Sequence, residues 1–344
     1  MTEPRLLVLL LNWRTAPMTL RAAAAGLHAM EGVRAALPGA RVEMVIVDND
    51  SGDGSFETMS AAAQENGWLA EGRVRVLQSG HNGGFGAGNN VGIRAGMSDG
   101  GAPDFVYLLN SDAFPEPDAI LTLLRALQAD PGAGIAGSRI TGEDGVPHET
   151  AFRFPSVLSE FEDAAGTGPI SRLLNRWRVP LPLPAATRRV DWVAGASMMI
   201  RREVLERIGM FDEGFFLYFE ETELCHRAAR AGFATLYVVE SRVMHIGSVS
   251  TGMKEWAEMP DYWFDSRLRY FVKTHGRFYA GLCTCAQILG AGVQRLRRPS
   301  KRKAAQGFLH RLVSHHRRAL RAGTPPVLSG GAGLDGLRDM KGKP

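Results

Sequence analysis

The chain has 344 residues, of which 45% are hydrophobic and 22% charged, an ordinary balance for a soluble globular protein of about two domains, or of one large α/β domain with an appendage. Its three cysteines, an odd number, exclude a disulfide or cysteine–metal framework and favour a reducing, cytoplasmic compartment. The net charge of +4 hides an asymmetry: residues 277–321 hold 11 Lys or Arg and no acid, whereas residues 1–276 hold 26 basic and 34 acidic residues. The positive charge therefore belongs to the tail.

The apolar run at 6–11 predicts a buried strand. It is too short for a secretory signal and leads into Asn12, Trp13 and Arg14 instead of a cleavage site. Downstream, short apolar or β-branched runs alternate with stretches that predict helices. The predicted strands lie at 6–11, 42–47, 74–77, 106–109, 135–140, 192–200 and 235–239, and the predicted helices at 17–30, 56–66, 118–129 and 202–208. This alternation predicts parallel βαβ units in an α/β fold.

The stretch 106–112 is the feature around which the chain is organised. Its apolar part has hydrophobic residues on both faces, which predicts a central strand of a covered parallel sheet. The strand runs into Asn110, Ser111 and Asp112, and ligands collect at the carboxyl ends of such strands. These oxygen-bearing side chains suit a hard divalent cation that also takes phosphate oxygens. An ordinary Asx-type turn explains the triplet alone equally well.

Two further polar segments follow predicted strands. Residues 48–55 repeat the pattern of an apolar strand that ends in polar residues. Residues 81–90 are rich in glycine, but they lack the G-x-G-x-x-G spacing and follow the third strand, which argues against a nicotinamide-binding Rossmann domain. Such a loop still lets backbone N–H groups approach a diphosphate or a ribose. A connection that only permits tight packing is the alternative.

The stretch 211–227 is a second focus, because an aromatic run leads into a predicted helix that opens with three carboxylates. Acids in a first helical turn complement the helix dipole. Glu221 falls on the apolar face, whereas Glu223 is expected to pair with Arg227 on the outer side and Glu220 to lie away from the inward face. An inward carboxylate needs a partner or a task, such as that of a general base.

Residues 141–189 contain six prolines and predict an irregular segment, of the kind that often forms a lid or binding loop. After it, His245 stands alone between apolar residues, and such a histidine is more often a core residue than a metal ligand.

Five motifs together resemble those of family 2 glycosyltransferases of the GT-A fold, in particular the bacterial rhamnosyltransferase-type enzymes of cell-surface polysaccharide synthesis. The motifs lie at 48–51, 82–89, 109–112, 192–196 and 211–227, in the family's order and spacing, and the match runs from residue 5 to about 250. The resemblance implies a mixed, mainly parallel sheet with helices on both faces. It also implies a nucleotide-diphospho-sugar donor, a divalent cation, Mg²⁺ or Mn²⁺, and an inverting transfer.

The same resemblance assigns roles to individual residues. Those matched to nucleotide-sugar contacts are Asp48, Ser51, Asn82, Gly83, Asn89, Asn110, Ser111, Gly195 and Ala196. Asp112 and His245 match the metal ligands, and Glu221 matches the catalytic base. Two positions depart from the family pattern. Asn110 stands where the metal motif begins with aspartate, and the base is often aspartate, which leaves Glu220 as an alternative to Glu221.

The predicted activity is transfer of rhamnose or another hexose, with dTDP-rhamnose favoured as donor and a UDP-sugar possible, to a lipid-linked or polysaccharide acceptor. A sugar-phosphate nucleotidyltransferase is one alternative, although the Gly-rich, Arg-containing loop it needs after the first strand is missing. A catalytically dead scaffold of a polysaccharide assembly complex is the other, although intact Asp112 and Glu221 argue against it.

The chain is divided into a catalytic domain at 1–250, a basic helical region at 251–323 and a disordered tail at 324–344. Residues that share one helical face of the second region are Phe278, Leu282, Cys285, Leu289 and Leu296. A basic cluster follows at 295–303. This combination predicts a helix that lies on an anionic membrane surface at the cytoplasmic face, and 278–293 is too short and polar to cross one. Packing on the catalytic domain is the main alternative, and no nucleic acid is expected as a partner.

Overall fold

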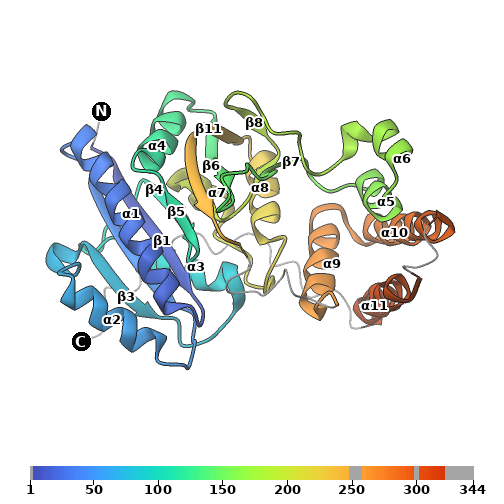
Figure 1. Ribbon diagram of the computed structural model, residues 1–344, viewed down its shortest axis with the longest axis horizontal. Coiled ribbons are helices and arrows are strands. Elements are labelled where there is room, and N and C mark those ends of the chain that lie inside the picture. The colour runs from blue at the N-terminus through green and yellow to red at the C-terminus, as the bar shows by residue number, and fades with distance from the viewer. Residues whose placement is uncertain (1–2, 248–257, 298–301, 322–344) are drawn as a thin grey trace.

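The computed structural model describes residues 3–247, 258–297 and 302–321 (Figure 1). A large mixed sheet has the strand order β3-β2-β1-β4-β10-β6-β11-β5, with β8 paired to β11. Its strands are β1 Arg5–Asn12, β2 Arg41–Asp48, β3 Val74–Gln78, β4 Phe105–Asn110, β5 Ala113–Pro115, β6 Ala133–Thr141, β8 Arg188–Val190, β10 Ser197–Arg201 and β11 Ala234–His245. A second small sheet pairs β7 (Ala151–Phe152) with β9 (Trp192–Val193).

Helices flank the sheet and also form a separate group beside it. Those that flank the sheet are α1 Ala16–Ala36, α2 Ser55–Glu65, α3 Gly84–Ala95, α4 Ala119–Ala129, α7 Arg202–Ile208 and α8 Glu220–Arg230. Those of the group are α5 Val157–Ala165, α6 Gly168–Leu173, α9 Asp261–His275, α10 Arg277–Arg297 and α11 Arg302–Arg321. Figure 1 shows this second group gathered at one end of the molecule, away from α1 and α2.

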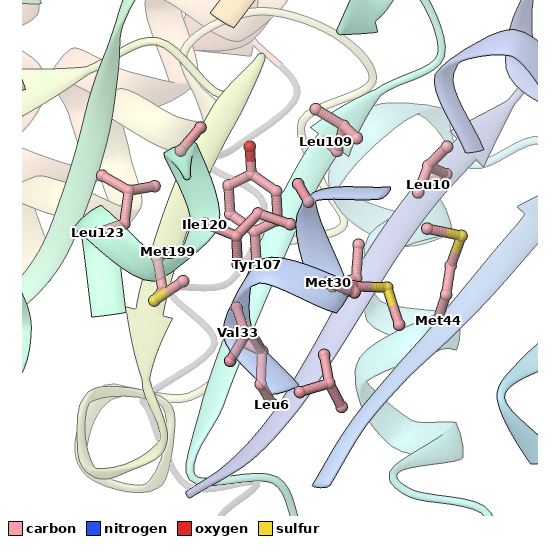
Figure 2. Close-up of a cluster of buried hydrophobic side chains, with 14 of the residues drawn as sticks. Leu6, Leu10, Met30, Val33, Met44, Tyr107, Leu109, Ile120, Leu123 and Met199 are labelled. Atoms are coloured by element: carbon pink, nitrogen blue, oxygen red, sulfur yellow. The ribbon is translucent and has the colours of Figure 1, made fainter. Parts of the chain in front are cut away.

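The first four strands form the parallel half of the sheet, as the sequence predicts. Strand β1 pairs in parallel with β2 on one side and β4 on the other, and its central leucines and valine are buried. Leu6 and Leu10 face the core beneath α1 and α4, where Met30 and Tyr107 also pack (Figure 2). Leu9 belongs to the second core, on the opposite face of the sheet. Burial on both faces explains the continuous apolar run.

The α/β prediction is confirmed, and three segments differ from it in detail. The run at 192–200 splits into β9 and the antiparallel β10, because residues 194–196 turn between the two sheets. Residues 141–189 are less irregular than predicted, since they contain α5, α6, β7 and β8. The glycine-rich segment is not an open loop beyond Gly83, because α3 begins at Gly84.

Helix α10 packs against α5 and α9 with its small residues. A methyl group added at Gly290 would lie 2.6 Å from the backbone oxygen of Phe161, so the crossing with α5 is close. Arg267 of α9 donates from Nε to the Glu160 carboxylate of α5 at 2.9 Å, and both side chains are buried. The helical group is therefore joined by packing and by a buried ion pair.

The apolar face predicted for α10 points outward. Phe278 is 82% exposed, Leu289 65% and Leu296 84%, whereas Ala280 and Cys283 on the other side are buried. None of the described helices is long and apolar enough to cross a membrane. The proposed boundary at residue 250, the tail at 324–344 and part of the basic cluster, including Arg298, lie outside the described residues.

Candidate active site

The carboxyl ends of β1, β2 and β4 meet at one edge of the sheet. Asn12 is paired with Asp48, and Leu11 with Asn110, in the parallel register. This register brings the polar residues that follow three separate strands to one place, as expected for ligand sites in such sheets.

Asp48 and Ser51 form a buried turn at this edge. The Ser51 hydroxyl donates to Asp48 Oδ1 at 2.6 Å, and the Ser51 backbone N–H donates to Asp48 Oδ2 at 3.1 Å. Asn12 Nδ2 donates to Asp48 Oδ1 at 2.7 Å, and the Arg14 backbone N–H donates to the Ser51 hydroxyl at 2.9 Å. Asn12 and Arg14 were missed in the sequence, although their place directly at the end of a predicted strand is the signal that identifies them. The nucleotide contacts assigned to Asp48 and Ser51 stay predictions.

The start of α3 lies beside this turn. Asn82 Oδ1 accepts from Asn49 Nδ2 at 3.0 Å and from the Gly84 backbone N–H at 3.1 Å. Asn89 is buried within the helix, and its Nδ2 donates to the Phe85 carbonyl at 2.9 Å. Asn82 and Gly83 are therefore partly open to solvent at the helix start, whereas Asn89 lies one turn inside. Their roles in nucleotide-sugar binding stay predictions.

Gly84 has a backbone conformation that residues with a side chain adopt only at a cost in free energy. Its φ is +89°, and an added Cβ would lie 1.7 Å from the backbone oxygen of Phe216. The adjacent Phe85 N–H donates to that same oxygen at 3.0 Å. This contact fixes the start of α3 against the segment that precedes α8.

Gly84→Ala is expected to lower the free energy of unfolding by about 2–4 kcal/mol, because the new methyl group both strains the backbone and collides with a carbonyl. Thermal or urea unfolding of the variant measures this loss. Gly168→Ala is the matched control, since nothing lies within 4 Å of its added Cβ. An unchanged unfolding midpoint for Gly84→Ala would show that the Phe216 segment moves away at little cost.

Asp112 and His245 meet although 133 residues separate them. Strand β11 pairs antiparallel with β5, which places His245 opposite Ala113, and the Ile246 N–H donates to the Asp112 carbonyl at 3.1 Å. His245 Nε2 lies 3.0 Å from Asp112 Oδ1 and 3.4 Å from Asn110 Nδ2. The pairing of β5 and β11 thus assembles the two predicted metal ligands.

The geometry of this pair fits a shared octahedral ion. Two ligand atoms about 2.1 Å from one ion and at right angles to each other are about 3.0 Å apart. The observed separation of Asp112 Oδ1 and His245 Nε2 is 3.0 Å. The described residues contain no group of three or more His, Cys, Asp or Glu that could hold a metal. Asp112 and His245 are thus the candidate ligands among the described residues, and such a pair suits an ion whose other positions are filled by substrate phosphates and water.

Ser111, Gly195 and Ala196 are buried near these residues. The Thr15 hydroxyl lies 3.5 Å from the Ser111 hydroxyl, and the Asn110 N–H donates to the Ala196 carbonyl at 3.0 Å. A Cβ added at Gly195 would lie 3.9 Å from the Cβ of Glu221. The segment between β9 and β10 thus connects the end of β4 to α8. The assigned sugar contacts of these three residues stay predictions.

Glu220 and Glu221 open α8 with two inward carboxylates. Glu220 is only 3% exposed, so the expectation that it lies away from the inward face is wrong. Burial raises the pKa of Glu221, and burial together with the neighbouring Glu221 carboxylate raises the pKa of Glu220 well above its ordinary value. The Oε2 atom of each is buried and has no hydrogen-bond partner among the described residues. A buried carboxylate oxygen without a donor is costly, which makes these two groups candidates for contact with a ligand.

Glu223, unlike Glu220 and Glu221, is held by ion pairs. It pairs with Arg227 as predicted, with Nε 2.7 Å from Oε1, but it is fully buried instead of outward-facing. The reason is α9, whose Lys273 covers it with Nζ 2.8 Å from Glu223 Oε1 and 2.7 Å from Asp212 Oδ2. Arg269 of α9 also pairs with Asp212 at 2.7 Å. These ion pairs hold the start of α8 and the turn before it against α9.

Backbone strain gathers at the same edge. Among the described residues, the non-glycine residues with positive φ are Arg14, Asp50, Tyr218 and Phe219. The first two follow β1 and β2, and the last two directly precede Glu220. Such conformations cost roughly 1–3 kcal/mol each and cluster at functional sites. Their distribution independently supports this edge as the candidate site.

The fold is of the GT-A type, and comparison with known proteins identifies the family. A family model described as "Glycosyltransferase like family 2" matches residues 26–262. The chain belongs to glycosyltransferase family 2 and is a glycosyltransferase.

Three relatives illustrate the range of similarity. N-acetylglucosaminyl-diphospho-decaprenol L-rhamnosyltransferase from Mycobacterium tuberculosis is 33% identical over 222 residues, which cover 61% of this chain and 68% of that protein. The rhamnosyltransferase WbbL from Escherichia coli K12 is 29% identical over 165 residues, covering 47% of this chain and 60% of that protein. The crystal structure of GalNAc-T7 with UDP, GalNAc and Mn²⁺ aligns with a TM-score of 0.55 at 15% identity, over 94% of this chain and 58% of that chain.

Proposed function

We propose that the protein is an inverting, divalent-cation-dependent glycosyltransferase that transfers rhamnose or another hexose from a nucleotide-diphosphate donor, with dTDP-rhamnose favoured over UDP-sugars. The observation that carries the proposal is the meeting of Asp112 and His245 at 3.0 Å, at the edge of the sheet where α8 presents Glu221. The rhamnosyltransferase names of two relatives support the sugar.

Asp112 and His245 would hold the cation, Mg²⁺ or Mn²⁺. A bound cation supplies positive charge that stabilises the departing diphosphate. The 3.0 Å separation of the ligand atoms supports this role, and so does the Mn²⁺ in the GalNAc-T7 complex.

The reaction is a single displacement in which the acceptor hydroxyl oxygen forms a bond to the anomeric carbon of the donor sugar. The bond from that carbon to the diphosphate oxygen breaks, and its electron pair leaves with the nucleoside diphosphate. Glu221 takes the hydroxyl proton and becomes neutral, while the departing diphosphate gains one negative charge, so the total charge is unchanged. Attack opposite the leaving group inverts the anomeric configuration. Glu221 is suited to this role because its Oε2 atom is buried without a hydrogen-bond partner among the described residues, and because burial raises the pKa of its carboxyl, which makes the ionised form a stronger base.

The purified protein tests the proposal directly. Thermal-shift measurements with UDP-, GDP- and dTDP-sugars, each with and without Mn²⁺, should show stabilisation that requires both nucleotide and cation. Slow release of the nucleoside diphosphate should accompany it, as water replaces the acceptor. Absence of stabilisation with every donor, in a protein that is folded by circular dichroism, would refute the proposed donor class.

We further propose that the acceptor is lipid-linked or a polysaccharide, and that the enzyme is peripheral on the cytoplasmic face of an anionic membrane. The M. tuberculosis relative is named for a diphospho-decaprenol acceptor. The outward side chains of Phe278, Leu289 and Leu296 on α10 form an apolar face, and the chain from 277 to 321 holds 11 basic residues and no acid. An apolar face beside basic residues favours the surface of an anionic bilayer.

Leu289→Glu together with Leu296→Glu is expected to weaken binding to phosphatidylglycerol vesicles by about 10-fold or more, since two apolar anchors are lost and two negative charges are added. Sedimentation with vesicles measures the change, and salt should weaken binding of the unmodified protein. Leu69→Glu, which alters an exposed leucine on another part of the molecule, should have little effect. Vesicle binding that is absent, or equal in all three proteins, would contradict the membrane proposal.

A further inference from the structure

An aromatic cluster lies beside the start of α8 and has no role in the donor chemistry. It consists of Phe216, Tyr218 and Tyr262. The ring centroids of Phe216 and Tyr262 are 5.4 Å apart, and those of Tyr218 and Tyr262 are 6.3 Å apart with planes inclined by 20°. Phe216 is 41% exposed, although its neighbour Phe215 is fully buried. The cluster therefore brings together two residues of the loop before α8, Phe216 and Tyr218, and Tyr262 from the first turn of α9.

The backbone of this cluster is held on both sides. The Phe216 carbonyl accepts from the Phe85 N–H at 3.0 Å, and the Leu217 carbonyl accepts from the Ser266 hydroxyl at 2.9 Å. Tyr218 has a φ of +70°, a conformation that is costly for a bulky residue. The exposed Phe216 thus belongs to a segment whose backbone is held by hydrogen bonds to α3 and α9.

A short chain of contacts links the cluster to the proposed base. Phe216 is bonded through its carbonyl to Phe85, and the Phe85 ring lies 3.2 Å from where a Cβ on Gly195 would be. The Cβ of Glu221 lies 3.9 Å from the same position. The acceptor is the reactant whose hydroxyl must reach Glu221, whereas the donor diphosphate belongs with Asp112 at the end of β4. The cluster is therefore placed for the acceptor.

We propose that the aromatic cluster binds the acceptor sugar that carries the attacking hydroxyl, an inference that rests on the proposed function. One face of a pyranose ring presents C–H groups with partial positive charge, which complement the negative face of an aromatic ring. A prenyl chain, by contrast, matches the extended apolar face of α10. The occupant of the cluster is accordingly a sugar ring, whose attacking hydroxyl has to reach Glu221 at the start of α8.

Phe216→Ala and Tyr262→Ala are each expected to raise the KM for acceptor by about 3- to 10-fold, because a ring that stacks on the sugar is lost. The probe is N-acetylglucosaminyl diphosphate on a short prenyl chain, with dTDP-rhamnose as donor. The KM for donor and the rate of donor hydrolysis should stay unchanged. Titration of the probe without donor should show the same loss of affinity, and Phe216→Tyr, which keeps the ring, should retain it.

The control is Leu69→Ala. The exposed fraction of Leu69, 43%, is similar to that of Phe216, but Leu69 lies elsewhere in the chain, before β3. It should leave both KM values unchanged. An unaltered acceptor KM in Phe216→Ala and Tyr262→Ala, with donor transfer intact, would overturn the sugar site while leaving the proposed function standing. Equal increases in the donor and acceptor KM would also overturn it, since the segment would then shape the whole site. Failure of the unmodified protein to bind any donor would instead refute the proposed function and this inference together.

Discussion

Glu221→Gln is expected to lower the turnover number by about 10²- to 10⁴-fold, the usual effect of removing a general base. Glutamine keeps the shape of the side chain but cannot accept the proton of the acceptor hydroxyl. Donor affinity should survive, since Asp112 and His245 are unchanged. Initial rates at saturating acceptor, with donor binding followed separately, measure the two effects. In the unmodified enzyme the rate should fall as the pH drops through the pKa of Glu221, which burial raises above that of an ordinary glutamate, because only the ionised carboxylate is a base.

Glu220→Gln is the matched control, and only a small loss of turnover is expected. The reason is the protonation state of Glu220, since its side chain is buried as well. Burial and the adjacent Glu221 charge raise the pKa of Glu220 well above its ordinary value, so the side chain favours the neutral acid. Glutamine is also neutral and of similar shape. If Glu220→Gln abolishes transfer while Glu221→Gln does not, the base is Glu220; if neither lowers the rate, α8 supplies no base.

Asp112→Ala is expected to abolish cation-dependent donor binding, with at least about a 100-fold loss of transfer, because only His245 of the proposed pair would remain. The carboxylate is buried beside β5, and its loss leaves a small gap without disturbing the sheet pairing, which uses backbone atoms. Calorimetric titration of nucleotide with Mn²⁺ and with EDTA measures the change in affinity.

Asp144→Ala, in an exposed turn, provides the comparison for Asp112→Ala and should bind nucleotide and cation normally. Nucleotide affinity that is the same with EDTA, with Mn²⁺ and in the Asp112 variant would refute the cation site. His245→Ala should resemble Asp112→Ala if the two side chains hold one ion.

The sequence predicts the position of a side chain best where the strand register of the backbone determines it. A parallel strand that ends in polar residues brings them to the carboxyl edge, so Asp48 and Asn110 were correctly placed at one edge. Helical periodicity predicted that Glu221 faces inward and that Glu220 and Glu223 face outward, but Glu221 is half-buried and the other two are buried. The prediction failed for Glu223 because periodicity does not reveal a second layer. Lys273 of α9 covers the side of α8 that was expected to face solvent.

Other parts of the structure depend on signals that are weak or distant in sequence. Helix α5 was missed in a proline-rich segment, where its capping box uses Ser156 with Ser159 at N3 instead of the usual Glu or Gln. His245 was a lone histidine by every local criterion. Only the pairing of β11 with β5, a long-range event, brings it to Asp112.

That pairing of β5 with β11 also determines when the enzyme becomes competent during its synthesis. Asp112 and His245 are 133 residues apart, so at about 5–20 residues per second the ribosome makes them roughly 7–27 s apart. In that interval the parallel half of the sheet is complete in sequence, but only one of the two proposed cation ligands exists. If Asp112 and His245 hold the cation as proposed, a chain that stops before β11 would not turn over activated sugar, and donor turnover would begin only after the last strand of the sheet has been added.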